Sequence, residues 1–149
     1  MSEILVLKLV HVLAAIVAVG ANVSYGFWLR LAGRDRDRLL FAIEGIRWLD
    51  RRIANPMYVV VLVTGVLMVL AGAYSFETGW IAASIALYVL VAIVGIVLFA
   101  PAIRRQLAEA ERDPSSAAYA AAAARTTRLG LATTAAVLVI VALMVTKPF

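Results

Sequence analysis

Four long apolar runs alternate with two arginine-rich stretches in this chain, and the alternation constrains the fold more than any motif does. Of the 14 Lys and Arg residues, all but Lys8 and Lys147 lie in the two stretches, at residues 30–52 and 104–128. Short loops that are rich in Lys and Arg stay on the cytoplasmic side of a membrane. The pattern therefore predicts four membrane spans, with both basic stretches inside and both termini outside.

The composition is typical of a membrane protein. Hydrophobic residues make up 64% of the 149 residues, charged residues 15%, and the mean hydropathy is +0.98. Soluble domains carry about 25% charged residues, and a hydrocarbon core about 30 Å thick needs roughly 20 apolar residues per helix. We therefore expect a single all-α domain, residues 1–149, folded as an antiparallel four-helix bundle. The expected spans are residues 4–31, 53–74, 79–103 and 129–146, with cytoplasmic loops at 32–52 and 104–128.

Both cytoplasmic loops have helical character. In the first, Leu39, Ile43 and Ile46 recur at helical spacing among charged residues. This pattern predicts a short helix that lies on the inner membrane surface. Residues 104–113 also favour a helix, so the bundle is expected to carry helical extensions on its cytoplasmic side.

Two prolines lie near the inner ends of the second and third spans. Asn55-Pro56 is typical of a helix start, because Asn can cap the helix and Pro suits its first position. Pro101 is expected to kink or end the third span, because proline cannot donate a backbone hydrogen bond inside a helix.

Charge and cysteine content exclude several classes of protein. The net charge of +5 is confined to loops that flank spans, where orientation and anionic lipid explain it, so no nucleic acid is expected as a partner. Cysteine is absent, which excludes disulfides, thiolate metal sites, iron–sulfur clusters and covalently attached c-type haem. Ala18-Val19-Gly20 resembles a signal-peptide cleavage site, but no basic region precedes the apolar run, so we expect a retained helix. The expected location is the inner membrane of a bacterium, with lipid and either further copies or a larger membrane complex as partners.

One face of the first span is polar. At 100° per residue, His11, Ala18, Asn22 and Tyr25 fall on the same side of the helix, and Ile16 falls on the opposite side. Polar side chains in hydrocarbon usually face the interior of a bundle, and small residues let a neighbouring helix approach closely. We therefore expect Ala18 to contact another helix and Ile16 to face lipid.

His11 is the only histidine and the one candidate ligand centre. It lies roughly 10 Å from the outer end of its span at 1.5 Å per residue, and matching depths across antiparallel spans places Met68 near it and Met144 nearer the outer surface. Histidine with methionine can ligate haem iron or cuprous copper. The candidate cofactor ligands are thus His11 and Met68, and Met144 joins them as a candidate metal ligand. Alternatively, His11 is a structural, neutral imidazole bonded to Thr64 or Tyr88. The residues expected on the polar face of the bundle are Asn22, Tyr25, Thr64, Ser84 and Tyr88.

Catalysis and proton-coupled transport find little support. The four expected spans contain no Asp or Glu, whereas a proton-coupled exporter of the small four-helix multidrug type depends on a membrane-embedded carboxylate. Ser84 can share a layer with His11, but no carboxylate at that depth could orient the imidazole as a base. We therefore expect no enzymatic activity.

Three stretches together resemble a known family. They are residues 8–13, the basic segment Leu49-Asp50-Arg51-Arg52 that leads to Asn55-Pro56, and Thr64-Gly65. They resemble the bacterial family of predicted integral membrane proteins of unknown function. More distantly, the chain is similar to the four-helix membrane proteins related to copper-resistance protein CopD and to the HemJ-type protoporphyrinogen oxidases. The HemJ-type proteins carry a histidine early in the first span, which His11 matches, whereas no residues here are matched to their other characteristic polar and basic positions.

Three functions of different classes follow from these observations. The first is a non-enzymatic structural or accessory subunit of a membrane complex, in which His11 is structural. The second is a membrane redox protein that binds haem b or copper through His11. The third is a small-molecule transporter.

Overall fold

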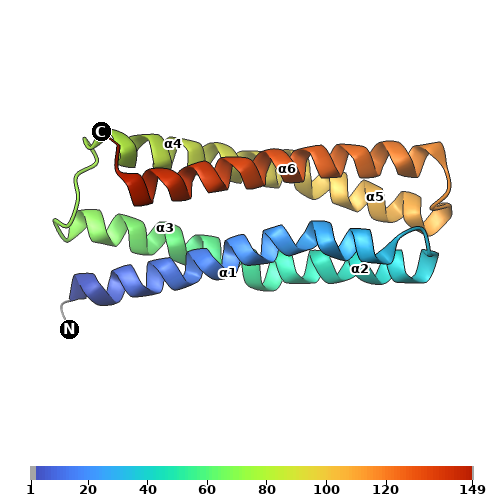
Figure 1. Ribbon diagram of the computed structural model, residues 1–149, viewed down its shortest axis with the longest axis horizontal. Helices are drawn as coiled ribbons and strands as arrows, with labels where there is room; N and C mark the ends of the chain where they lie inside the picture. Colours follow the sequence, from blue (N-terminus) through green and yellow to red (C-terminus); the bar gives the residue numbers. More distant parts are fainter. Residues whose placement is uncertain (1–2, 149) are drawn as a thin grey trace.

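The computed structural model describes residues 3–148, and these form four long, antiparallel helices (Figure 1). Each of the four is long and apolar enough to cross a membrane. The protein is therefore an all-α membrane protein. In chain order the elements are α1 (Glu3–Ala32), α2 (Arg36–Leu49), the π-helix η1 (Asp50–Ala54), α3 (Asn55–Leu70), α4 (Gly79–Val94), the π-helix η2 (Gly95–Phe99), α5 (Ala100–Arg112) and α6 (Ala117–Thr146).

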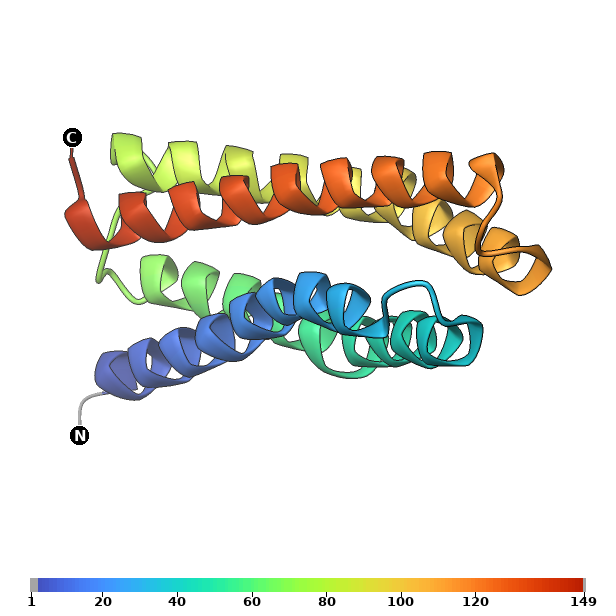
Figure 2. The same cartoon turned by 45° about the vertical axis from the view of Figure 1, so that its right-hand side comes forward.

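The helices associate as two pairs. α1 packs along α2, η1 and α3, while α6 packs along α4 and α5, and the two pairs meet mainly where α2 contacts α5 (Figures 1 and 2). The turn between α3 and α4 lies at the same end of the bundle as the start of α1 and the end of α6 (Figure 1). The opposite end consists of α2, η1, α5 and the adjoining parts of α1 and α6 with their turns. It carries all the arginines and is called the arginine-rich end below.

Short polar turns close the arginine-rich end. Gly33 adopts a φ of 63°, which glycine tolerates without strain, and the chain reverses there from α1 into α2. The Asp35 side chain then caps α2 by accepting a hydrogen bond of 2.9 Å from the amide of Arg38. On the other side, the Ser116 hydroxyl caps α6 by accepting a hydrogen bond of 3.1 Å from the amide of Tyr119.

The second long helix, made of α2, η1 and α3, and the third, made of α4, η2 and α5, run without interruption through their prolines. In each, a π-helical segment comes immediately before the proline: the amide of Asn55 bonds to the carbonyl of Asp50 ahead of Pro56, and the amide of Ala100 bonds to the carbonyl of Gly95 ahead of Pro101. A proline ring in a regular α-helix clashes with the carbonyl four residues earlier. A π turn widens the helix and displaces that carbonyl. The prolines therefore change the helical pitch and do not end the helices.

The expectation of a separate helix on the membrane surface was wrong. Residues Arg36–Leu49 form α2, which continues into α3 and lies against α1 and α5. The side chains of Leu39, Ile43 and Ile46 are only 1%, 0% and 1% exposed. The amphipathic pattern was correctly identified, but protein covers its apolar face where lipid was expected.

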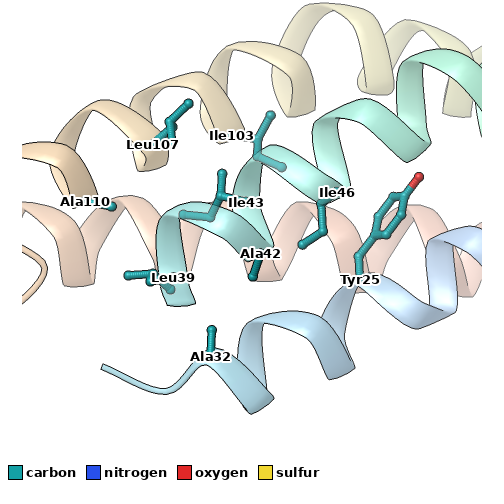
Figure 3. Packing of buried hydrophobic residues seen from close by; sticks show 9 residues of the cluster. All are labelled: Tyr25, Ala32, Leu39, Ala42, Ile43, Ile46, Ile103, Leu107 and Ala110. Carbon is teal, nitrogen blue, oxygen red and sulfur yellow. The ribbon is translucent and has the colours of Figure 1, made fainter. Parts of the chain in front are cut away.

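The hydrophobic core lies at the arginine-rich end. Figure 3 shows its nine side chains converging from α1, α2 and α5. Burial of apolar surface stabilises a fold only when the alternative is contact with water, so we expect this end to be surrounded by water. The members are Tyr25, Ala32, Leu39, Ala42, Ile43, Ile46, Ile103, Leu107 and Ala110.

Small and polar residues hold the rest of the bundle together. Ala18 is fully buried against the second helix, whereas Ile16 on the opposite side of α1 is 62% exposed, as the sequence predicted. Lipid tails are as apolar as leucine, so helices in a membrane associate through close packing of small residues and through hydrogen bonds. Large apolar side chains accordingly point outward over most of this region.

Aromatic residues and a lysine connect the helices at the other end. The rings of Tyr74 and Trp80 meet edge to face with their centroids 5.5 Å apart. The ammonium of Lys147, just after α6, lies 5.1 Å from the Tyr74 centroid and 5.7 Å from that of Trp80. Such cation–π contacts tie the end of α6 to the turn between α3 and α4.

Candidate functional site

Hydrogen bonds between side chains follow the line of contact between α1 and the second helix. The α1 residues in this line are His11, Asn22 and Tyr25, and their partners on the second helix are Thr64, Tyr58 and Asp50. We call these six residues the polar seam. The seam residues of α1 follow the spacing of the buried residues Ala14 and Ala18, because positions three and four apart share one face of a helix.

His11 occupies the part of the seam farthest from the arginine-rich end. Its Nδ1 lies 3.0 Å from the Oγ1 of Thr64, and the Thr64 hydroxyl donates its own hydrogen to the carbonyl of Val60 at 2.6 Å. A hydroxyl has one hydrogen to donate, so the Thr64 oxygen accepts and His11 Nδ1 carries the proton. In the neutral form of this imidazole Nε2 is then the acceptor, and the hydrogen bonds of residues 3–148 include none to it.

Gly65 provides the space for this imidazole. A Cβ at position 65 would lie 3.3 Å from Cε1 and 3.7 Å from Nδ1 of His11, which is a tight contact. The Thr64-Gly65 pair thus has two separate roles: Thr64 orients the ring, and Gly65 lets it approach the backbone.

Asn22 and Tyr58 make up the middle of the seam, and Tyr88 contacts Tyr58 from outside it. The Asn22 amide donates a hydrogen bond to the Tyr58 hydroxyl, and the Tyr88 hydroxyl of α4 donates one of 2.8 Å to the backbone carbonyl of Tyr58. The rings of Tyr58 and Tyr88 meet edge to face, with their centroids 6.5 Å apart. Tyr88 therefore connects the seam to the other helix pair and does not bond to His11.

A carboxylate ends the seam at the arginine-rich end. The Tyr25 hydroxyl donates to Asp50 Oδ1 at 3.5 Å, and the Asn55 amide donates to Asp50 Oδ2 at 3.2 Å. The sequence was interpreted as placing Asp50 in a loop, but Asp50 lies at the start of η1 with its carboxylate turned toward α1. Asp50 and Tyr58 are the two seam residues that were not identified from the sequence.

The remaining candidate residues lie outside this network. Ser84 is buried, with 1% exposure, and donates to the Trp80 carbonyl of its own helix at 2.7 Å. Met68 is buried on α3 one turn beyond Thr64, and Met144 is half-buried on α6. None of the hydrogen bonds in the described part of the chain joins either methionine to His11. Ligation of a cofactor or metal by His11, Met68 and Met144 stays a prediction.

The seam can supply one well-oriented nitrogen ligand. Histidines that bind metals usually donate their other ring N–H to an oxygen, which fixes the tautomer, and the bond to Thr64 gives His11 this arrangement. Among residues 3–148 no group of three or more His, Asp or Glu side chains could hold a metal ion. His11 would therefore supply one nitrogen ligand to a metal or cofactor, without a second and third ligand from Asp or Glu side chains of residues 3–148.

Comparison with known proteins identifies the family and not an activity. No curated protein and no solved structure matches the chain. Residues 5–148 match a family described as predicted integral membrane protein (DUF2269). This match covers nearly the whole chain, including all four long helices and the polar seam. The protein therefore belongs to the DUF2269 family of predicted integral membrane proteins.

Proposed function

We propose that the protein is a non-enzymatic accessory subunit of a complex in the inner membrane of a bacterium. The arginine-rich end faces the cytoplasm, in keeping with the positive-inside rule, and binds a partner protein there. One observation carries this proposal: the arginine-rich end presents large apolar side chains on its surface, although its own hydrophobic core is complete.

The exposed side chains form a contiguous surface. Phe27, Trp28 and Leu31 at the end of α1 are 65%, 39% and 80% exposed, and Phe41 of α2 is 68% exposed. The centroids of the Trp28 and Phe41 rings are 6.3 Å apart, so the two helices contribute to one patch. We call these four residues the aromatic surface.

The position of the aromatic surface argues against lipid as its covering. Phe41 precedes Arg52 by about 11 helical residues, or roughly 16 Å at 1.5 Å per residue. Arg52 in turn immediately precedes the apolar run of α3. Phe41 therefore lies well outside the hydrocarbon, where an exposed apolar patch marks a site of protein interaction.

The charges around the aromatic surface define the kind of partner. Arg30, Arg34 and Arg38 are exposed and lie within one helical turn of its members along α1, the turn and α2. A complementary surface has apolar residues at its centre and carboxylates at its rim. The partner is thus a cytoplasmic segment with exposed apolar residues flanked by Asp or Glu.

Photo-crosslinking in cells tests the proposal. A photoreactive amino acid at Phe41 is expected to form one discrete adduct with a different protein when the chain is expressed at its natural level. The matched control is the same probe at Leu131, which is 67% exposed on α6 within a membrane span. An adduct lost on Phe27→Asp supports the proposal. Adducts no more frequent than at Leu131, or only between copies of this chain, would overturn it.

Cofactor binding is the second candidate function, and the acceptor Nε2 of His11, to which the hydrogen bonds of residues 3–148 include none, is the observation that favours it. In this alternative the protein is a membrane redox protein with haem b or copper bound at His11. The test is an absorption spectrum and metal analysis of the purified protein. A Soret band or stoichiometric copper that His11→Ala abolishes would establish the site, whereas a colourless, metal-free protein would eliminate it. Transport of a small molecule finds no comparable support, because Asp50 lies at the end of the seam and not in mid-membrane.

A further inference from the structure

We propose that the protein binds the headgroup of an anionic phospholipid in a groove formed by Arg47, Trp48, Arg51 and Arg52. This site lies on the second helix where α2 passes through η1 into α3. The proposal goes beyond the accessory function and does not depend on it. The ligand is defined by its chemistry as a phosphate diester attached to two acyl chains.

The groove is built from residues that lie one turn apart on the helix. Its lining consists of Arg47, Trp48, Arg51, Arg52 and Glu44, and it has a volume of about 320 Å³. Residues four apart are neighbours on a helix surface. Arg47 and Arg51 therefore form one pair of neighbours, and Trp48 and Arg52 form a second pair beside the first. Glu44 lies one turn farther from the membrane, at the end of the groove where a headgroup substituent and not the phosphate would lie.

The guanidinium groups of this groove are free to bind an anion. Within residues 3–148 the one ion pair joins Arg112 to Glu109, at 3.7 Å. Arg47, Arg51 and Arg52 donate to none of the side-chain and backbone acceptors described for that part of the chain. Arginine presents several donors in a planar fork that matches phosphate oxygens, so three such groups around one groove supply more donors than one phosphate needs.

Two helices independently place arginines at the level of the lipid phosphates. Residues 53–70 of the second helix form an uncharged run of about 18 residues, or roughly 27 Å. Residues 129–146 of α6 form a run of the same length, preceded by Arg128 and Arg125. Both lengths approach the hydrocarbon thickness of about 30 Å, so Arg52 and Arg128 lie at the same boundary.

The composition of the groove favours lipid over an acidic peptide. Trp48 is 59% exposed and lies beside Arg52, and tryptophan is enriched at the level of lipid headgroups. An acyl chain could continue from a phosphate at this level along the exposed side chains of α3, such as Val59 and Val63, which are 59% and 50% exposed. A soluble peptide would have no use for this apolar continuation.

Lipid binding to the purified full-length protein tests the site. The protein is delipidated in a mild detergent and titrated with phosphatidylglycerol or with phosphatidylcholine of the same acyl chains, and binding is followed by native mass spectrometry. Juxtamembrane arginines each contribute severalfold to binding of anionic lipid. We expect the triple variant R47Q/R51Q/R52Q to bind phosphatidylglycerol about tenfold or more weakly than the wild type. Phosphatidylcholine should bind the wild type more weakly than phosphatidylglycerol does. Its affinity should also fall less in the triple variant.

A charge-matched control separates a site from general attraction. The variant R30Q/R34Q/R38Q also removes three exposed arginines from the arginine-rich end and should leave phosphatidylglycerol binding within about twofold. Equal losses in the two triple variants, or no loss in the first, would overturn the proposal. Inorganic phosphate is titrated alone as well. If it binds as tightly as phosphatidylglycerol, the groove is a site for a free anion and the lipid proposal is wrong.

A single substitution keeps the test valid if the triple variant does not fold. Far-ultraviolet circular dichroism and the melting temperature establish the fold of each variant before titration. Arg51→Gln alone should then weaken phosphatidylglycerol binding severalfold, because Arg51 lines the groove. Unchanged binding by this variant would refute the site.

Discussion

The location of the hydrophobic core predicts that mutations at the two ends of the bundle have very different costs. Ile43 of α2 is 0% exposed and packs within the core between α1, α2 and α5. Ile43→Ala removes three buried carbon atoms, or roughly 2.4 kcal/mol at about 0.8 kcal/mol for each. The cavity adds to this cost, because three helices surround the site and limit its collapse. We expect the free energy of unfolding to fall by about 3–4 kcal/mol.

The control for this substitution is the same change in contact with lipid. Ile96 lies in η2 and is 74% exposed, so lipid or detergent fills the space that Ile96→Ala vacates. The free energy of unfolding should therefore fall by less than about 1 kcal/mol. Both variants are prepared in the same mild detergent and unfolded by adding a denaturing detergent. The loss of native structure is followed by tryptophan fluorescence. Equal costs at the two positions would refute the reasoning that the core forms at the end surrounded by water.

Substitutions at Thr64, Gly65 and Ser115 test local contacts. Thr64→Val removes the hydroxyl that accepts from His11 Nδ1 and should lower the free energy of unfolding by about 0.5–2 kcal/mol. Thr64→Ser keeps a hydroxyl there and should retain most of the wild-type stability. Gly65→Ala presses a methyl group on the imidazole and should lower the melting temperature, whereas Gly26→Ala, where a Cβ meets nothing within 4 Å, should not. Hydrogen bonds from the Ser115 side chain and amide lower the pKa of Asp113, so Ser115→Ala should raise that pKa in a carboxyl carbon NMR titration. The lowered pKa means that the stabilisation by this turn is complete above the ordinary carboxyl pKa and is lost as pH falls through the folded value. A free energy of unfolding unchanged by Thr64→Val, a melting temperature lowered no more by Gly65→Ala than by Gly26→Ala, or an Asp113 pKa unchanged by Ser115→Ala would each contradict the corresponding contact.

The helices and their buried faces were predictable from the sequence. The length of the apolar runs is set by membrane thickness, and all four appear as helices. The small residue Ala18 and the large residue Ile16 differ in exposure as helical periodicity requires. These features follow from local geometry and from the solvent, so no knowledge of partner helices is needed to derive them.

The continuity of the second helix was not predictable from the same rules. Pro56 was interpreted as a helix start, whereas a π turn ahead of it lets the helix continue. The apolar face of Leu39 and Ile43 looks the same in sequence whether lipid or protein covers it. Only the positions of α1 and α5 decide that question, and they are a property of the tertiary structure.

The candidate site was partly predictable. His11 and Thr64 share a depth in antiparallel spans, so their contact follows from counting residues. Asp50 was not identified because it is charged and lies among arginines. Continuing the spacing of Leu39, Ile43 and Ile46 by four more residues leads to Asp50, so the same periodicity that revealed the amphipathic face could have placed its carboxylate against α1.

Labelling of single cysteines tests the central claim that the arginine-rich end stands in the cytoplasm, outside the hydrocarbon. The protein contains no cysteine, so each introduced thiol is the only one to react. With a membrane-impermeant maleimide, Glu44→Cys should label only in inverted vesicles, Glu77→Cys only in right-side-out vesicles, and Leu62→Cys in neither. Protection of Glu44→Cys from both sides, or its labelling from the outside, would contradict the account.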